Sequence, residues 1–319
     1  MRIKYIIISI LFVAAAGFVL SGCTTETKTN TNTTANIGTG DVTGNLDIKG
    51  SDTLLQLVSS MAEAFTDINP DAEVTVTGGG SGTGIAALLN GEVDMANASR
   101  DVKSSEEETA TEAGMGIYKF IVARDGLSII VSPDNPVEEL TVEQVGKIYK
   151  GEITNWSEVG GNDVDITLYG RQSTSGTYEF MKDEVLEGDY ASTMLNLEGN
   201  QAIVDAVVDD ENDSGVGYVG IGYAVEAGDT VKILNIASAE GGTYYEPTDA
   251  SNIASGDYPI TRPLYQVFSA VPEKDGIAHE LLKFEMSDAG IDIVEEVDFY
   301  EPNVADQEAN QTLLDMIEG

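Results

Sequence analysis

The sequence predicts a layered α/β protein with two lobes, and three observations support this prediction. From Leu46 onward, short β-like runs alternate with amphipathic segments. Such alternation favours a largely parallel sheet flanked by helices. The roughly 275 residues after this point suffice for one large domain or two medium lobes. We see no repeat of fixed period, which argues against a solenoid.

The expected elements follow in chain order. The first helix lies within residues 52–65, where apolar residues recur every three or four positions, at Leu54, Leu57, Val58, Met61 and Phe65. We expect further helices at 84–91, 141–149, 177–186, 200–208, 276–285, 289–295 and 306–317. We expect strands at 46–50, 73–78, 93–99, 125–132, 164–170, 215–220, 231–236 and 258–269. Two chain crossings, near 125–131 and 259–268, would join the lobes.

The N-terminus has the layout of a secretory signal, with Arg2 and Lys4 ahead of an apolar run that ends in small residues. The only cysteine, Cys23, follows Leu20-Ser21-Gly22, which resembles a lipobox and predicts lipidation of that cysteine. An uncleaved anchor helix is the alternative, and both place the protein outside the cytoplasm and on a membrane. Residues 23–45 contain almost no apolar side chain and are expected to form a flexible tether.

The chain is strongly acidic, with 55 Asp and Glu against 16 Lys and Arg. Removal of Arg2 and Lys4 with the signal takes away two positive charges and changes the net charge from −39 to −41. A nucleic-acid partner is therefore disfavoured, because phosphate backbones require a basic surface. We interpret the charge as a solvated acidic surface, as in proteins that must stay soluble in high salt.

Three loops with glycine, serine and threonine stand between a predicted strand and a predicted helix. They are "GSDTLL" at 50–55, "GGGSGTG" at 78–84 and "GRQSTSGTYEF" at 170–180. The first turn of a helix has unpaired N–H groups and the positive end of the helix dipole. Taken singly, each loop is explained by a capped helix or a tight turn. Three such starts together with Arg171 instead indicate an anion site.

Other glycine-rich motifs and catalytic groupings do not fit. No lysine follows the glycines as a Walker loop requires, the Rossmann spacing is absent, and Thr83 stands where a nucleophile elbow needs glycine. The only histidine, His279, lies on a predicted helix far from the loops in sequence, and we expect it to be an ordinary surface or packing residue. A catalytic triad or a His/Cys metal cluster is not readily built from these residues. We therefore expect no enzyme activity, no metal and no cofactor.

Seven segments in order resemble the phosphate-binding lipoproteins of phosphate ABC transporters, the PstS-type family of extracellular solute-binding proteins. They are "GSDTLL", "GGGSGTGI", "GEVDMANASR", "YKGEITNWSEVGG", "GRQSTSGTYEF", "GVGYVGIGYA" and "YPITRPLYQVF". The resemblance covers roughly residues 45 to 300. It implies a type II periplasmic-binding-protein fold that closes on one phosphate ion and delivers it to a membrane permease. It also implies a monomer at the outer face of the cell membrane, held by a lipid anchor.

Site residues implied by the resemblance come from both lobes. They are Thr53, the N–H of Leu54, Ser81, Arg171, Ser175, Gly176 and Thr177. Some family members have an aspartate where this chain has Arg100, and that aspartate accepts a proton from the ligand. Arg100 is then expected to add a cationic contact, and Asp52 or Asp101 to act as the proton acceptor. We favour Asp52, which lies in a predicted ligand loop, although it equally suits a helix N-cap.

The resemblance also suggests domain boundaries and leaves alternatives to phosphate capture. We expect a signal at 1–22, a tether at 23–45, lobe I at 46–127 with 262–319, and lobe II at 128–261. A binder of sulfate, molybdate or tungstate would share the fold. A secreted phosphohydrolase is disfavoured because a catalytic histidine and a metal cluster are not found in the sequence.

Overall fold

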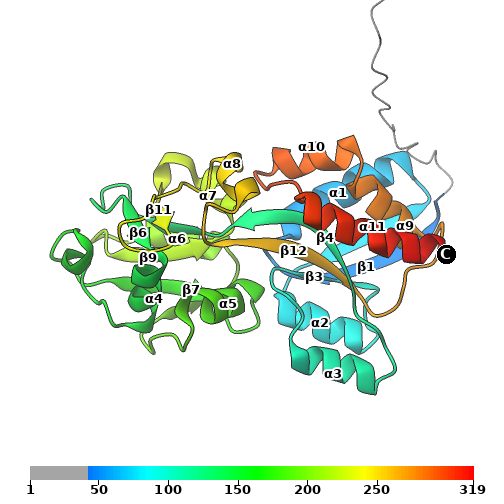
Figure 1. Cartoon of the computed structure of the whole chain (residues 1–319), viewed down its shortest axis with the longest axis horizontal. Helices are drawn as coiled ribbons and strands as arrows, with labels where there is room; N and C mark the ends of the chain where they lie inside the picture. Colours follow the sequence, from blue (N-terminus) through cyan, green and yellow to red (C-terminus); the bar gives the residue numbers. More distant parts are fainter. Residues whose placement is uncertain (1–41) are drawn as a thin grey trace, which may run out of the picture. The chain divides into compact units, whose positions relative to one another are not determined.

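The computed structural model describes residues 42–319, so the expected signal, Cys23 and most of the expected tether lie outside the described residues. Two five-stranded sheets form the centres of two α/β lobes (Figure 1). We call lobe I the part built on the sheet with strand order β2-β1-β3-β12-β4, and lobe II the part built on β10-β5-β9-β7-β8. A two-stranded sheet of β11 and β6 accompanies lobe II.

Lobe I combines the first third of the chain with its C-terminal part. Its elements are β1 (Gly44–Gly50), α1 (Leu55–Ile68), β2 (Ala72–Thr77), α2 (Ser81–Leu89), β3 (Met95–Ala98), α3 (Ser104–Glu112), β4 (Tyr118–Gly126), β12 (Thr261–Phe268), α9 (Ile277–Glu285), α10 (Asp288–Glu296) and α11 (Val304–Glu318). The first strand begins two residues earlier than expected, and α3 was not expected because its sequence, "SSEEETATE", has no apolar stripe.

Lobe II is one continuous segment. Its elements are β5 (Ser128–Val131), β6 (Glu139–Thr141), α4 (Val142–Lys150), η1 (Trp156–Val159), β7 (Thr167–Arg171), α5 (Gly176–Phe180), η2 (Met181–Leu186), β8 (Leu195–Leu197), α6 (Gln201–Val208), β9 (Gly215–Val219), α7 (Ile221–Ala227), η3 (Gly228–Thr230), β10 (Lys232–Ile233), β11 (Asn235–Ala237) and α8 (Ala250–Ser255). The expected helix at 177–186 is therefore a short α-helix continued by a π-helical turn.

Both central sheets are mixed, which confirms the expected fold class in its coarser form. In lobe I, β1 runs parallel to β2 and β3, whereas β12 runs antiparallel to β3 and β4. In lobe II, β7 runs parallel to β8 and β9, whereas β5 runs antiparallel to β9 and β10. Half of these strand pairs are antiparallel, so the expectation of largely parallel sheets was too strong. The alternation of strands and helices along the chain does not show whether a strand such as β12, which follows the whole of lobe II, pairs parallel or antiparallel with its neighbours.

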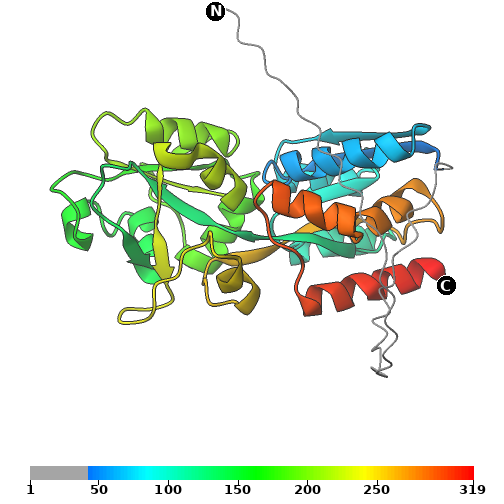
Figure 2. The same ribbon diagram turned by 90° about the horizontal axis from the view of Figure 1, so that it is seen from above.

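Helices cover both faces of each sheet, and each face has its own hydrophobic core. In lobe I, α1, α9, α10 and α11 pack on one face and α2 with α3 lies on the other (Figures 1 and 2). In lobe II, α4 and η2 cover one face, and α6 with α7 covers the other. Trp156 lies in the first of these lobe II cores, where its ring N–H donates to the Ser214 carbonyl at 2.9 Å. This tryptophan of "GEITNWSEVGG" therefore has a structural role.

The two chain crossings between the lobes lie side by side. The chain passes from β4 to β5 through Leu127, whose N–H donates to the carbonyl of Ile260, just before β12, at 2.9 Å. The Tyr258 hydroxyl donates to the Leu127 carbonyl at 2.7 Å. The paired crossings keep the carboxyl-terminal ends of the lobe I strands close to lobe II, and the candidate site lies there.

Candidate anion-binding site

Loops from both lobes converge where their strands end. In lobe I, the segment 51–54 follows β1, the glycines at 78–80 follow β2, and Ser99 follows β3. In lobe II, the segment 172–175 joins β7 to α5. Because β1, β2 and β3 are parallel, their carboxyl ends share one edge of the sheet, which is where ligands bind in open α/β sheets. The fold thus gathers the serine and threonine residues that the sequence singled out.

The loops make direct contact across the lobes. The hydroxyl oxygens of Thr53 and Thr177 are 3.1 Å apart, and the Gly82 N–H donates to the Thr174 carbonyl at 3.1 Å. A Cβ added at Gly176 would collide with the hydroxyl oxygens of Ser81 and Ser99. Glycine at position 176 is therefore required for the close approach of the lobes.

Four hydroxyl groups line this contact, and we call them together with the Arg171 guanidinium the donor cage. They belong to Thr53, Ser81, Ser175 and Thr177, all of which are buried. Each of the three expected helix starts contributes, since Thr53 precedes α1, Ser81 begins α2 and Ser175 is the N-cap of α5. The caps of α1 and α2 make no side-chain hydrogen bond, but backbone carbonyls accept the N–H of Leu55 in α1 at 3.4 Å and that of Gly82 in α2 at 3.1 Å. The positive ends of both helix dipoles still lie at the site.

Backbone N–H groups fix the direction of two of these hydroxyls. The Ser81 oxygen accepts the N–H of Ser99 at 3.0 Å. The Ser175 oxygen accepts the N–H groups of Thr177 and Tyr178 at 3.2 and 3.4 Å. A hydroxyl has one hydrogen and accepts with its lone pairs. The Ser175 hydrogen is then available for a ligand that offers acceptors, whereas the Ser81 hydroxyl also lies 3.3 Å from the Ser99 hydroxyl, in a contact where either oxygen can be the donor.

Arg171 is 1% exposed and ends β7. Its Nη2 is 2.5 Å from Oδ2 of Asp52, and its Nη1 donates to Oδ1 of Asn200 at 3.2 Å. Its backbone N–H donates to the Tyr218 hydroxyl at 3.0 Å. Within residues 42–319, its buried Nε has no hydrogen-bond partner. Burial lowers the pKa of Arg171, and the neighbouring Asp52 opposes that effect, so a bound anion would further favour the charged form.

Asp52 lies inside the site and Asp101 does not. The second oxygen of Asp52 accepts the Gly79 N–H at 2.8 Å. The N-cap of α1 is Leu54, so Asp52 does not serve as that cap. The carboxylate of Asp101 is 57% exposed, pairs with Lys119 at 2.7 Å and accepts its neighbour's N–H. These contacts direct the Asp101 side chain to the lobe I surface and do not favour it as the proton acceptor.

Arg100 is buried beside the site and forms an ion pair with Glu106. Both of its terminal nitrogens donate to Glu106, at 2.9 and 2.7 Å, and Nη1 also donates to the Asp101 carbonyl. Nη2 nevertheless lies close to the glycine loop, 3.8 Å from the position that a Cβ on Gly82 would occupy. The charge of Arg100 is thus largely compensated by Glu106, and the structure does not support the expected direct cationic contact.

A second buried ion pair was missed from the sequence. Arg262 and Asp125 face each other on β12 and β4 and are 1% and 0% exposed. Nε and Nη2 of Arg262 donate to Oδ2 of Asp125 at 3.0 and 2.7 Å. Nη2 also donates to the Thr177 hydroxyl at 3.0 Å. The signal in the sequence was the presence of opposite charges, Asp125 and Arg262, within two strands that also contain apolar residues, since charges are seldom buried unless paired.

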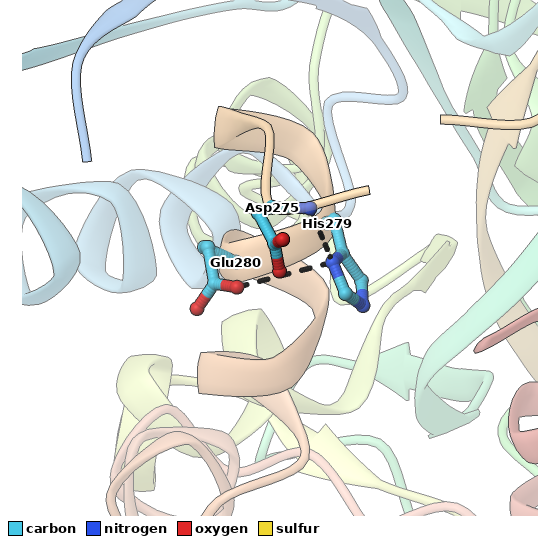
Figure 3. Close-up of side chains that lie close together, drawn as sticks. All are labelled: Asp275, His279 and Glu280. Carbon is cyan, nitrogen blue, oxygen red and sulfur yellow. Dashed lines mark hydrogen bonds and ion pairs between the residues drawn. The ribbon is translucent and has the colours of Figure 1, made fainter. Parts of the chain in front are cut away.

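His279 belongs to a small cluster with Asp275 and Glu280 far from these loops in sequence (Figure 3). The Asp275 N–H donates to Nδ1 of His279 at 3.0 Å, so this nitrogen serves as an acceptor. Glu280 pairs with Lys283 at 2.8 Å. Burial lowers the pKa of His279, partly opposed by Glu280. Turn geometry and an ion pair therefore explain the cluster, and His279 is a packing residue, being 1% exposed.

The fold and the site together define a class, the two-lobed solute-binding proteins whose ligand lies between the lobes. A family model described as "PBP superfamily domain" matches residues 29–289. The chain belongs to the PstS family of phosphate-binding proteins. It is 33% identical over 271 residues to the phosphate-binding protein PstS of Pseudomonas aeruginosa, covering 79% of this chain and 81% of that protein. The corresponding protein of Staphylococcus haemolyticus is 31% identical over 254 residues, covering 78% and 79%.

Solved structures agree with this assignment. A Clostridium perfringens protein whose structure contains bound phosphate matches with a TM-score of 0.71 and 27% identity, over 82% of this chain and all of that one. A phosphate transport receptor of Vibrio cholerae matches with a TM-score of 0.66 and 30% identity, over 81% of this chain and all of that one. The curated relatives are phosphate-binding proteins and the Vibrio cholerae protein is a transport receptor, which agrees with the expectation that the chain is not an enzyme.

Proposed function

We propose that this protein captures inorganic phosphate between its two lobes. The observation that carries the proposal is the donor cage, in which the buried hydroxyls of Thr53 and Thr177 meet across the lobes at 3.1 Å and the buried Arg171 guanidinium pairs across the lobes with Asp52. Hydrogen-bond donors with their hydrogens free suit a ligand that consists of acceptor oxygens. An arginine fork adds charge and matches pairs of oxygens.

The ligand would take its contacts from both sides of the cage. Lobe I supplies Thr53, the N–H of Leu54 and Ser81. Lobe II supplies Arg171, Ser175, Thr177 and the N–H of Gly176, which starts α5. The Thr53 and Thr177 hydroxyls contact each other and Arg171 pairs with Asp52. Phosphate would insert among these groups and compete for donors that already have partners, such as the Leu54 N–H, which donates to the Ser51 carbonyl at 3.2 Å, and the Arg171 guanidinium.

Delivery to a membrane permease completes the proposed role. The names of the relatives support it, since the Vibrio cholerae protein is a receptor of an ABC-type transporter. We propose a signal at 1–22, lipidation of Cys23, a tether at 23–45, lobe I at 46–127 with 262–319, and lobe II at 128–261. The protein would act as a monomer on the outer face of the membrane. No helix within residues 42–319 has the length and apolar character needed for a membrane span.

Anchoring is tested by fractionation of cells that express the full chain. The wild type is expected in the membrane fraction and Cys23→Ser in the medium or the soluble extracytoplasmic fraction. Intact-mass measurement of the wild type should show a lipid-modified N-terminus at Cys23. An unmodified chain that remains on the membrane would favour an uncleaved anchor helix over the lipid.

Ligand identity is tested by competition at equilibrium. Labelled phosphate bound to the protein is displaced with unlabelled phosphate, sulfate, molybdate or tungstate. Displacement by phosphate at far lower concentration than by the other anions supports phosphate capture. If another oxyanion displaces the label equally well or better, the protein is a binder of that ion or a general binder of tetrahedral oxyanions.

A further inference from the structure

Arg262 links three parts of the molecule through one guanidinium group. Its Nη1 donates to the Ser99 carbonyl of lobe I at 2.9 Å. Its Nε and Nη2 hold Asp125 on the strand that leads to lobe II. Its Nη2 also reaches the Thr177 hydroxyl, which belongs to α5 of lobe II, at 3.0 Å. The planar group is further held by the Phe180 ring, whose centroid is 5.2 Å from Cζ.

The contact with Thr177 has a fixed direction. A guanidinium group donates hydrogen bonds and cannot accept them, so the Thr177 oxygen must be the acceptor. The single hydrogen of that hydroxyl then points elsewhere, and the next oxygen is that of Thr53 at 3.1 Å. Arg262 thus occupies one of the two lone pairs of Thr177 and keeps the hydroxyl hydrogen directed away from the guanidinium, where it can be donated to Thr53 or to a ligand between the lobes.

We propose that Arg262 is a positioning residue, which occupies one lone pair of the Thr177 hydroxyl and so directs the hydrogen of that hydroxyl towards an acceptor oxygen of a ligand between the lobes. This inference rests on the proposed function and adds to it the residue that sets the polarity of one ligand contact. Ser81 and Ser175 obtain the same polarity from backbone N–H groups. The Thr177 oxygen accepts no backbone N–H in the described chain, and the Arg262 side chain orients this hydroxyl instead.

Asp125 holds the Arg262 guanidinium in place. Its Oδ2 accepts both bonds from Arg262, and its Oδ1 accepts the Ile221 N–H at the start of α7 at 3.0 Å. Asp125 therefore orients the guanidinium and at the same time ties it to lobe II. Lysine at position 262 would keep the positive charge but could not reproduce the fork that bonds Asp125, Ser99 and Thr177 together.

A double-mutant cycle tests the proposal by calorimetric titration with inorganic phosphate. We expect Arg262→Lys to weaken binding by about tenfold or more, as expected for loss of a charged hydrogen bond that orients a ligand group. In the Thr177→Val background, where no hydroxyl is left to orient, the same change should weaken binding by less than about threefold. A matched cycle with Ser81→Ala should leave the full effect of Arg262→Lys, since Ser99 orients that hydroxyl.

Equal factors in the wild-type and Thr177→Val backgrounds would overturn the proposal, because a general charge or a structural role does not depend on that hydroxyl. Failure of the wild type to bind phosphate would instead overturn the proposed function. If Arg262→Lys does not fold, the cycle is run with Asp125→Asn/Arg262→Met. That neutral pair avoids an uncompensated buried charge and keeps an acceptor for Ile221. The expected and contradicting results are the same for this pair.

Discussion

Arg171 and Asp52 form an ion pair across the lobes, with Nη2 of the arginine 2.5 Å from Oδ2 of the aspartate. Asp52 comes from the first loop of lobe I and Arg171 from the end of β7 in lobe II. Asp52 compensates the charge of Arg171, so an anion entering the cage would compete with Asp52 for the guanidinium. Arg171 should therefore favour anion binding, whereas Asp52 should oppose it by competing for the guanidinium.

Replacement of Arg171 tests whether its guanidinium contacts the anion. We expect Arg171→Ala to weaken phosphate binding by about 2–5 kcal/mol, because a buried charged contact to the anion is lost. Calorimetry gives the affinity, and circular dichroism should show an unchanged fold. Lys182→Ala is the matched control, since Lys182 is a lobe II cation that pairs with the exposed Asp189. Near-native affinity in Arg171→Ala would remove Arg171 from the site.

Asp52 is expected to determine selectivity. A desolvated acceptor facing the ligand favours an anion that carries a proton and repels one that carries none. Phosphate should therefore be preferred over sulfate by several orders of magnitude, and Asp52→Asn should narrow that gap. Competition titrations with both anions measure the ratio. Asp101→Asn is the matched control, because Asp101 pairs with Lys119 at the surface, and a ratio that changes equally in both variants would contradict the assignment.

Gly176 tests whether close approach of the lobes is needed for binding. A methyl group at this position collides with the hydroxyl oxygens of Ser81 and Ser99. Gly176→Ala should abolish or strongly weaken phosphate binding, by about 100-fold or more, while the thermal midpoint stays close to that of the wild type. Gly188→Ala, where a Cβ meets no atom closer than 3.7 Å, should bind normally. Normal binding by Gly176→Ala would show that the lobes need not meet at this point.

The buried carboxyl of Glu285 should make the stability of the fold depend on pH, independently of ligand binding. Burial raises the pKa of this carboxyl from 4.5 to about 8, and a hydrogen bond from Gln266 opposes the shift only in part. Between these values the folded state keeps a proton that the unfolded state has released, so the contribution of Glu285 to stability falls as pH rises from about 4.5 to about 8 and is constant above that.

Glu285→Gln should remove this fall. Its free energy of unfolding should exceed that of the wild type increasingly from pH 5 to pH 8, reaching on the order of a few kcal/mol. Urea denaturation at several pH values measures both proteins under the same conditions. A constant difference between the two proteins across this range would contradict a raised pKa of Glu285.

Much of the fold could be predicted from sequence because periodic apolar patterns mark amphipathic helices and buried strands. The stripe from Leu54 to Phe65 is one example, and α1 indeed buries that face. The polar helix α3 could not be found in this way. The hydroxyl loops were identified because glycine, serine and threonine gather between a strand and a helix, and the structure brings Thr53 and Thr177 into contact.

What sequence could not give is the direction of side chains. Asp52 and Asp101 both stand next to a candidate ligand residue, yet only Asp52 lies within the site. Arg262 and Asp125 are 137 positions apart along the chain. Their pairing depends on the antiparallel register of β12 and β4, which no local pattern shows.

Calorimetric titration of anion-free protein with inorganic phosphate tests the central claim most directly. We expect saturable binding of one phosphate per chain, with affinity far above that for sulfate, because one cage of donors lies between the lobes. Absence of saturable phosphate binding, or saturation at a ratio other than one, would contradict it.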